Sequence, residues 1–370
     1  FPNAKAAEEA SYEEYKANLR RTAENFRITD DHLGEGGPKA KFQANVEAIK
    51  LLKYLEETTE QATPEQQKIL SRYVGWGGLA DAFDPDKESW SKEYAQLKEL
   101  LTPEEYAAAR GSTLNAHYTS PTVIKAIYEA VGRMGFETGN ILEPSCGVGN
   151  FFGMLPEEMR NSRLYGVELD SISGRIAQQL YPKADITVAG FETTDRRDFY
   201  DLAVGNVPFG QYQVRDKAYD KLNFSIHNYF FAKALDQVRP GGVVAFVTSR
   251  YTMDAKDSTV RRYLAQRAEL LGAIRLPNDA FKKNAGAEVV SDIIFLQKRD
   301  RPLDIVPEWT QTGQTEDGFA INRYFLDHPE MVLGRQEPES TAHGMDYTVN
   351  PIEGLELADQ LHDAVKYIRG

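Results

Sequence analysis

Residues 140–153, NILEPSCGVGNFFG, pass from an apolar run into a glycine-rich turn and then into a short aromatic segment. Gly147 and Gly149 let the backbone turn tightly and approach a ligand closely, and a helix is expected to start just beyond them. The spacing Gly147-x-Gly149-x-x-x-Gly153 differs from the G-x-G-x-x-G pattern of dinucleotide-binding turns. The stretch therefore predicts a strand, a ligand-binding turn and a helix, with a ligand other than a dinucleotide.

Two acids refine the expected ligand. Glu143 stands four residues before Gly147, where its charge would oppose a pyrophosphate but suit the ammonium group of an amino-acid ligand. S-adenosylmethionine carries such an ammonium, a sulfonium and no phosphate. Glu168 ends the next apolar run about twenty residues after the glycines, the usual place for an acid that accepts ribose hydroxyls. A structural turn with a structural acid is the alternative, and Asp170 is expected to cap the next helix.

Apolar runs and helical patterns alternate from residue 115 to about residue 300. This alternation predicts an α/β, Rossmann-like doubly wound sheet that is mainly parallel, with an antiparallel last strand and ligands at the carboxyl ends of its strands. The predicted strands are residues 140–144, 163–169, 185–190, 200–206, 241–249, 269–276 and 291–298. Helical patterns lie between most of them, at residues 120–134, 170–181, 225–238 and 258–268.

The segments on either side of this region have different patterns. Residues 1–114 are predicted to form an N-terminal helical domain, in which Thr63 and Thr102 each begin a capping box with proline in the first helical position. Residues 301–370 start with a stretch rich in Pro, Gly and Thr, which indicates a linker and a small C-terminal extension. The chain begins at Phe1 and ends in a helical pattern, so we expect a fragment of a longer polypeptide.

Composition restricts the function classes. No apolar run reaches the roughly 18 residues that span a bilayer, and no signal peptide is recognisable, so we expect a soluble cytoplasmic protein without a membrane partner. Cys146 is the single cysteine, which excludes a disulfide framework and a Cys-rich zinc site. The net charge of -13 argues against a whole-surface attraction to nucleic acid. Residues 205–300, however, carry fifteen Lys and Arg against ten Asp and Glu, a local balance of +5.

The predicted strand 200–206 ends in GNVPFG, residues 205–210. An amino group on an aromatic ring is a poor nucleophile because its lone pair is delocalised into the ring. The side-chain oxygen of Asn206 and the carbonyl of Val207 could both accept its N–H groups and pull the nitrogen toward tetrahedral geometry. Phe209 could stack on the base, and Pro208 would stiffen the turn. The alternative is an ordinary Asn-x-Pro turn.

Taken in order, EPSCGVG, GVE and NVPF resemble motifs I, II and IV of N6-adenine DNA methyltransferases. HYTSP, residues 117–121, resembles motif X in the γ arrangement, in which it precedes motif I. The flanking stretches GEGGPKAKFQANVEAIKLL and YVGWGGLADAFD resemble the methylase part of large methylase-helicase proteins of phages and conjugative elements. Phage defence-against-restriction proteins belong to that group.

The resemblance implies transfer of a methyl group from S-adenosylmethionine to the N6 amino group of a flipped adenine in DNA. It implies no metal, a cytoplasmic bacterial or phage-encoded protein, and a helicase domain in the same longer polypeptide. The catalytic residues would be Asn206, Val207, Pro208 and Phe209. The cofactor-binding residues would be Tyr118, Thr119, Glu143, Pro144, Gly147, Gly149, Glu168, Phe191 and Asn206. The residues on the DNA side would be Phe209, Arg250, Phe281, Lys282 and Lys283.

Two departures from the family pattern keep alternatives open. Val207 replaces the first proline of motif IV, and Gly190 stands where motif III usually has an Asp, so we expect Phe191 to stack on the cofactor's adenine. One alternative is a methyltransferase for another planar amine, in an RNA base or a protein glutamine. Another is a decayed DNA-binding module. A cytosine-C5 enzyme would need a nucleophilic cysteine in its catalytic loop, whereas Cys146 lies in the glycine turn, where we expect it to be packed.

Overall fold

The computed structural model describes residues 3–114, 118–208, 210, 212–281 and 289–369. The chain forms two compact units. Unit 1 comprises residues 1–116, 146–154 and 164–189, and unit 2 comprises residues 117–145, 155–163 and 190–370. Within the described residues, no helix is long and apolar enough to cross a membrane.

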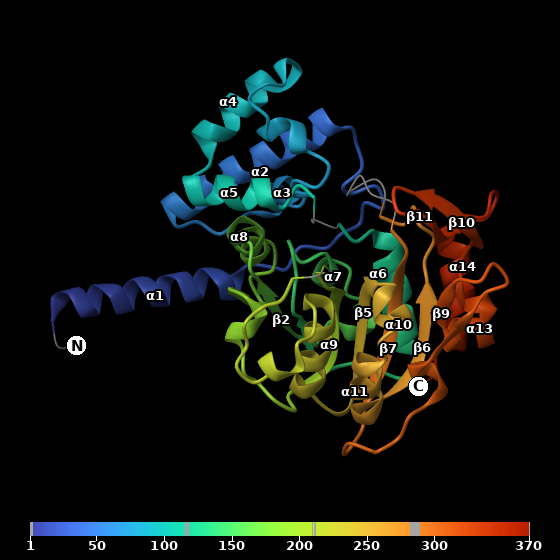
Figure 1. Cartoon of the computed structure of the whole chain (residues 1–370). Coiled ribbons are helices and arrows are strands. Elements are labelled where there is room, and N and C mark those ends of the chain that lie inside the picture. Colours follow the sequence, from blue (N-terminus) through green and yellow to red (C-terminus); the bar gives the residue numbers. More distant parts are fainter. Residues whose placement is uncertain (1–2, 115–117, 209, 211, 282–288, 370) are drawn as a thin grey trace. The chain divides into compact units, whose positions relative to one another are not determined.

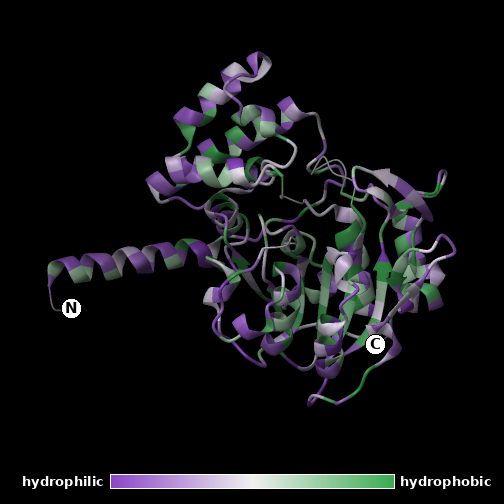
Figure 2. Ribbon diagram, in the orientation of Figure 1, coloured by the Kyte–Doolittle hydropathy of each residue, from purple (hydrophilic) through white to green (hydrophobic). Residues whose placement is uncertain are grey.

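Unit 1 combines the N-terminal helices with two parallel strands. Its helices are α1 (Ala4–Thr22), α2 (Pro38–Thr58), α3 (Pro64–Leu70), α4 (Ser91–Leu100), α5 (Pro103–Gly111), α7 (Asn150–Gly153) and α8 (Ser171–Leu180), with 3-10 turns η1 (Ala80–Phe83) and η2 (Glu88–Trp90). Strand β2 (Arg163–Glu168) pairs in parallel with β3 (Asp185–Val188). Helix α1 has no buried residue, and Figure 2 shows it mainly in hydrophilic colours.

Both predicted capping boxes are confirmed. The Thr63 side chain accepts the N–H of Gln66, whose side chain accepts the N–H of Thr63 in return. Thr102 and Glu105 make the same reciprocal pair at the start of α5. These bonds satisfy N–H groups that a helix start otherwise leaves without partners, which explains why the Thr-Pro pattern locates the two helices.

Unit 2 contains five strands in the order β1-β4-β5-β7-β6. Strands β1 (Asn140–Glu143), β4 (Tyr200–Asn206) and β5 (Val238–Ser249) are parallel, and β7 (Ser291–Lys298) runs antiparallel to β5 and to β6 (Ala268–Arg275). Helices α9 (Ile226–Gln237) and α11 (Thr259–Arg267) lie in front of these strands in Figure 1, and α6 (Pro121–Arg133) lies behind them. The prediction of a mainly parallel sheet with an antiparallel last strand is confirmed.

The remaining elements of unit 2 are short. They are η3 (Glu157–Met159), η4 (Phe191–Thr193), η5 (Asp220–Leu222), α10 (Tyr251–Asp254), η6 (Glu308–Thr310), β8 (Thr312–Gln314), β9 (Ala320–Asn322), α13 (Arg323–Asp327), η7 (Pro329–Met331), β10 (Arg335–Thr341), β11 (Gly344–Asn350), α14 (Leu357–Ala364) and η8 (Val365–Tyr367). Residues after 301 therefore form two hairpins, β8–β9 and β10–β11, and several helical turns. Their Pro and Gly residues indicated a linker, but residues of the same types also supply hairpin turns.

Three strands each have a polar residue at their carboxyl end. In unit 2, Glu143 ends β1 and Asn206 ends β4, and because these strands are parallel both residues lie at the same edge. In unit 1, Glu168 ends β2. The carboxyl ends of parallel strands are where ligands of such folds bind, so these three side chains define where to look for a site in each unit.

Candidate functional site

The glycine turn of unit 1 needs glycine for two different reasons. Gly147 has φ +57° and Gly149 has φ +86°, both in the left-handed region that side chains disfavour. A Cβ atom on Gly149 would lie 2.5 Å from Cε2 of Tyr181, whereas one on Gly147 would meet no described atom within 4 Å. Gly149 therefore packs closely against Tyr181, and the backbone at Gly147 borders open space.

Glu168 holds this turn in place. Its Oε1 accepts the N–H of Gly147 at 2.8 Å, and its Oε2 accepts the N–H of Asp170 at 2.7 Å. Burial raises the pKa of the Glu168 carboxyl to about 7, against the opposing effect of those backbone N–H groups. Each carboxylate oxygen has more than one acceptor site, so this carboxyl can take further donors, such as hydroxyl groups.

Tyr73 is a neighbour of this acid that the sequence did not single out. Its side chain is 2% exposed, and burial, followed by the charge of Asp170, raises the pKa of its phenol well above the ordinary value. The buried side chain of Asn45 fixes the turn after Tyr73, since it accepts the N–H of Val74 at 2.9 Å and donates to the carbonyl of Gly75 at 2.6 Å. In the sequence, the position of Tyr73 just before the glycine turn in YVGWGG was the signal that could have identified it.

Asp170 and Cys146 have the roles expected of them. The Asp170 side chain accepts the N–H of Ser173 at 2.9 Å and so caps α8. Cys146 is buried, and its N–H donates to the carbonyl of Val167 at 3.0 Å. Among the described residues, no group of three or more His, Cys, Asp or Glu side chains could hold a metal ion.

Asn206 is the central residue of the candidate site in unit 2. Its side-chain oxygen Oδ1 is buried and accepts no hydrogen bond from the residues that the structure describes. The preceding Gly205 has φ +154°, and a Cβ atom there would lie 3.6 Å from Cγ of Glu143 and 3.8 Å from Cδ of Pro144. The end of β4 thus lies close to the end of β1. A buried acceptor without a donor is costly, which points to a ligand that supplies one.

The residue after Asn206 accounts for one departure from the family pattern. Val207 is 1% exposed, and its N–H donates to the carbonyl of Val247 at 3.1 Å. A proline has no N–H and could not make this bond. Val207 therefore extends the pairing of β4 with β5 by one hydrogen bond beyond Asn206. Pro208 is half-buried, and Phe209 lies outside the described residues.

His227 contacts the backbone just beyond the same motif. It is the second residue of α9. Burial lowers the pKa of its imidazole to about 4, so the ring is neutral at pH 7. Nδ1 of His227 accepts the N–H of Gly210 at 3.5 Å, and Nε2 lies 3.2 Å from Oγ of Ser225.

Three further residues were predicted to bind the cofactor, and all three are buried or half-buried. Phe191 is buried, with its ring centroid 4.9 Å from that of Phe230, and Nζ of Lys233 lies 5.3 Å from its centroid. Thr119 is buried and Tyr118 is half-buried, just before α6. These three roles in cofactor binding stay predictions.

On the DNA side, the predicted roles also stay predictions. The Arg250 guanidinium forms ion pairs with Asp254 and Asp346, each at 3.1 Å. Phe281 is buried. Lys282 and Lys283 lie outside the described residues.

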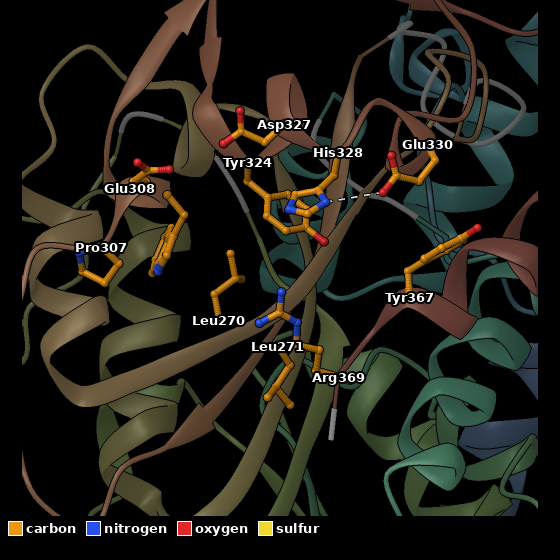
Figure 3. A pocket seen from close by; sticks show the side chains of 11 residues that line it. Leu270, Leu271, Pro307, Glu308, Tyr324, Asp327, His328, Glu330, Tyr367 and Arg369 are labelled. Atoms are coloured by element: carbon orange, nitrogen blue, oxygen red, sulfur yellow. Dashed lines mark ion pairs between the residues drawn. The ribbon is translucent and has the colours of Figure 1, made fainter.

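A separate hollow lies elsewhere in unit 2. It has a volume of about 360 Å³ and is lined by residues of β6, α13 and the C-terminal segment (Figure 3). Figure 3 shows Tyr324 beside His328, whose ring centroids are 4.6 Å apart, and the ion pair of His328 with Glu330 at 3.4 Å. Leu270 and Leu271 lie near the start of β6, whereas Asn206 and Glu143 lie at strand ends, so this hollow is distinct from the candidate site.

A family comparison decides what kind of protein carries these features. The model of the family described as N-6 DNA Methylase matches residues 99–311, more than half of the chain. The chain belongs to the N-6 DNA methylase family. The resemblance inferred from motifs X, I, II and IV is thereby confirmed, and the match includes both Glu168 and Asn206.

Individual relatives agree with this family. The chain is 29% identical over 272 residues to the defense against restriction protein B of Escherichia phage P1, covering 72% of this chain and 10% of the phage protein. It is 37% identical over 92 residues to the type II methyltransferase M.CvrRI of Paramecium bursaria Chlorella virus XZ-6E, covering 25% of this chain and 24% of that one. The chain thus spans a tenth of the first relative's length and about a quarter of the second's.

Among solved structures, the chain is similar to the M protein of the type I restriction enzyme EcoKI. The TM-score is 0.40 at 15% sequence identity, and the match covers 70% of this chain and 62% of that one.

Proposed function

We propose that this chain transfers a methyl group from S-adenosylmethionine to the N6 amino group of adenine in DNA. One observation carries the proposal: Oδ1 of Asn206 is a buried acceptor at the end of β4 with no donor among the described residues. The N6 group of adenine supplies N–H donors, and membership of the N-6 DNA methylase family supports DNA as the substrate. Because an adenine inside a duplex is out of reach, the target base would be flipped out.

The residues of unit 1 fit the adenosine part of the proposed cofactor. Open space borders the backbone of Gly147, and Glu168 retains acceptor sites for ribose hydroxyls beside it. In unit 2, the buried carboxylate of Glu143 suits an ammonium group. When bound, S-adenosylmethionine would supply an electrophilic methyl group. We further propose that Tyr118, Thr119, Pro144 and Phe191 complete the cofactor contacts.

We propose that the catalytic residues hold the N6 amino group of the target adenine in position. Oδ1 of Asn206 and the carbonyl of Val207 would accept the two N–H groups and orient the nitrogen lone pair away from the base ring. Asn206 is a positioning acceptor and not a base, because an amide does not take up a proton at neutral pH. Pro208 would stiffen the turn, and the ring of Phe209 would stack on the base.

The proposal extends to the rest of the polypeptide. The methyltransferase domain would comprise residues 115–300, after the helical domain 1–114 and before the extension 301–370. A helicase domain in the same complete polypeptide is part of the proposal because the resemblance to methylase-helicase proteins implies it, and the phage P1 relative, of which this chain covers 10%, is much longer than this chain. On the DNA side, Arg250, Phe281, Lys282 and Lys283 would lie near the bound strand.

The test is a transfer assay with labelled S-adenosylmethionine and DNA, RNA or a glutamine-containing peptide. Digested DNA should yield labelled N6-methyladenine. Asn206→Ala should lower the rate by a hundredfold or more, because positioned groups of this kind contribute about that much. Asn140→Ala is the matched control, since Asn140 begins β1 at the opposite end of the strand from Glu143. Label in RNA or peptide but not in DNA would refute the proposal.

A further inference from the structure

Tyr251 is an exposed ring beside the candidate site. It is 47% exposed and begins α10 two residues after the end of β5. In the parallel pairing of β4 with β5, Val247 is the partner of Asn206. Tyr251 therefore lies just beyond the same strand edge as the proposed amine-binding residue, four positions after the partner of Asn206.

Arg250 holds this ring in place. Its guanidinium carbon lies 4.5 Å from the centroid of the Tyr251 ring, and its Nη2 donates to the Tyr251 hydroxyl at 3.2 Å. The same guanidinium lies 5.2 Å from the centroid of Tyr347 on β11. Arg250 thus packs against two rings, one exposed and one buried.

The position of the Arg250 guanidinium is itself fixed by ion pairs with carboxylates of α10 and β11. Asp254 of α10 and Asp346 of β11 each approach the guanidinium at 3.1 Å. Asp254 is itself held, because its Oδ1 accepts the N–H of Asn322 at 2.8 Å and its Oδ2 lies 2.8 Å from Nη1 of Arg275. A ring supported in this way loses little conformational entropy when a ligand binds it.

The charged residues around Arg250 indicate which part of DNA could bind at Tyr251. Arg275 makes a bidentate pair with Asp292, at 2.8 and 2.9 Å. The cluster holds Arg250 and Arg275 against Asp254, Asp292 and Asp346, and Arg261 also interacts with Asp254, so its positive and negative charges balance when all are ionised. Because its arginines are already paired with carboxylates, the cluster has little net charge to attract a phosphate, whereas the exposed face of the Tyr251 ring can stack on a base.

We propose that Tyr251 binds the DNA substrate by stacking on an unpaired base, with Arg250 as the positioning residue behind it. This rests on the proposed function, because DNA and an unpaired base come from it. It assigns Arg250 a supporting place behind the ring on the DNA side of the site. Aromatic stacking of this kind is tolerant of sequence, so Tyr251 would contribute affinity without selecting a recognition sequence.

The test compares strand binding by the full chain and its variants. The probes are a fluorescent 20-nucleotide DNA strand and its fully paired duplex, and fluorescence anisotropy gives the affinity. Tyr251→Ala and Tyr251→Leu should weaken single-strand binding about five- to a hundredfold, and Tyr251→Phe should bind like the unmodified protein. Duplex binding should change much less, since its bases are already stacked. Tyr367→Ala, a similarly exposed tyrosine at the separate hollow, is the control.

The affinities measured for folded Tyr251 variants either support or overturn the proposal. Melting temperatures first identify folded variants, and Tyr251→Leu retains an apolar side chain if the alanine variant does not fold. Unchanged single-strand affinity in either folded variant would overturn the proposal, and so would an equal loss of affinity for the paired duplex. If the unmodified chain transfers no label to DNA while Tyr251→Leu still loses single-strand affinity, the proposed function fails and the role of Tyr251 stands.

Discussion

Val207 connects strand pairing to the chemistry proposed for Asn206. The family pattern has a proline here, yet the N–H of Val207 donates to Val247 and its side chain is buried. Val207→Pro should therefore lower the free energy of unfolding by about 1–3 kcal/mol, because a buried carbonyl loses its donor. Methyl transfer by the folded variant should remain within a few-fold, since the carbonyl proposed to accept the amine is still present. Denaturant unfolding and the transfer assay measure the two effects.

Val207→Ala is the control for this change. It keeps the N–H and removes buried methyl groups, so it too should lose stability while it keeps the Val247 bond and transfer activity. If the proline variant lost transfer at a temperature where it is folded, the carbonyl alone would not suffice. The departure from the family pattern would then be a requirement of this site.

If Glu168 accepts the ribose hydroxyls as proposed, cofactor binding should depend on pH. Burial raises the pKa of this carboxyl to about 7, and the ionised form is the better acceptor for ribose hydroxyls. Since a group with pKa 7 is about one tenth ionised at pH 6 and nine tenths ionised at pH 8, affinity for S-adenosylmethionine should rise about tenfold between them. Calorimetric titration of the folded protein at several pH values measures this.

The raised pKa has a separate effect on stability. The folded protein holds this proton more tightly than the unfolded chain, so the contribution of Glu168 to stability falls as pH rises from about 4.5 to about 7. Glu168→Gln removes the titration and serves as the control for both effects. Equal pH dependence of cofactor affinity in the two proteins would show that another group is responsible.

At the scale of helices and strands, local sequence was sufficient for most of the fold. The predicted strands 200–206 and 291–298 match β4 and β7 residue for residue, because each is an apolar run bounded by polar or turn residues. The two Thr-Pro capping boxes located α3 and α5 for an equally local reason. The residues after 301 were harder, because Pro and Gly mark loops and hairpins alike.

The candidate site was predictable only where its residues follow strands. Glu143, Glu168 and Asn206 each stand at the end of an apolar run that was predicted as a strand, so their positions were enough to propose them. Tyr73 contacts Ser173, and Arg250, which packs against Tyr251, pairs with Asp346; both partners are distant in sequence. The glycine turn after Tyr73 could draw attention to that residue, but a single sequence holds no local signal for such pairs.

At the scale of the whole molecule, the N-terminal helices join the same unit as the glycine turn. Arg175 of α8 connects them, since its guanidinium pairs with Glu56 of α2 at 2.7 Å and with Glu105 of α5 at 3.1 Å. Lys53 of α2 completes the group at 2.6 Å from Glu105. Helices α2 and α5, which end 60 or more residues before α8 begins, are thus held to the helix that follows Glu168.

Glu105 is the member of this group whose removal should matter most. Burial opposes ionisation, but hydrogen bonds from Lys53 and from the Thr102 N–H lower the pKa of its carboxyl to about 2. The stability it contributes is therefore complete above about pH 4.5 and is lost as pH falls toward 2. Glu105→Gln should lower the denaturant midpoint at pH 7, and the difference from the unmodified protein should shrink between pH 4.5 and pH 2.

Glu157→Gln is the matched control for Glu105. Glu157 makes an ion pair of the same 2.6 Å length with Arg160, but both side chains are largely exposed, so its loss should change the midpoint by little at any pH. Unfolding followed by tryptophan fluorescence would report mainly on unit 1, because two of the three tryptophans, Trp76 and Trp90, are buried there and only Trp309 lies in unit 2. If the two variants lost equal stability at pH 7, the group around Arg175 would hold the N-terminal helices no better than a surface pair does.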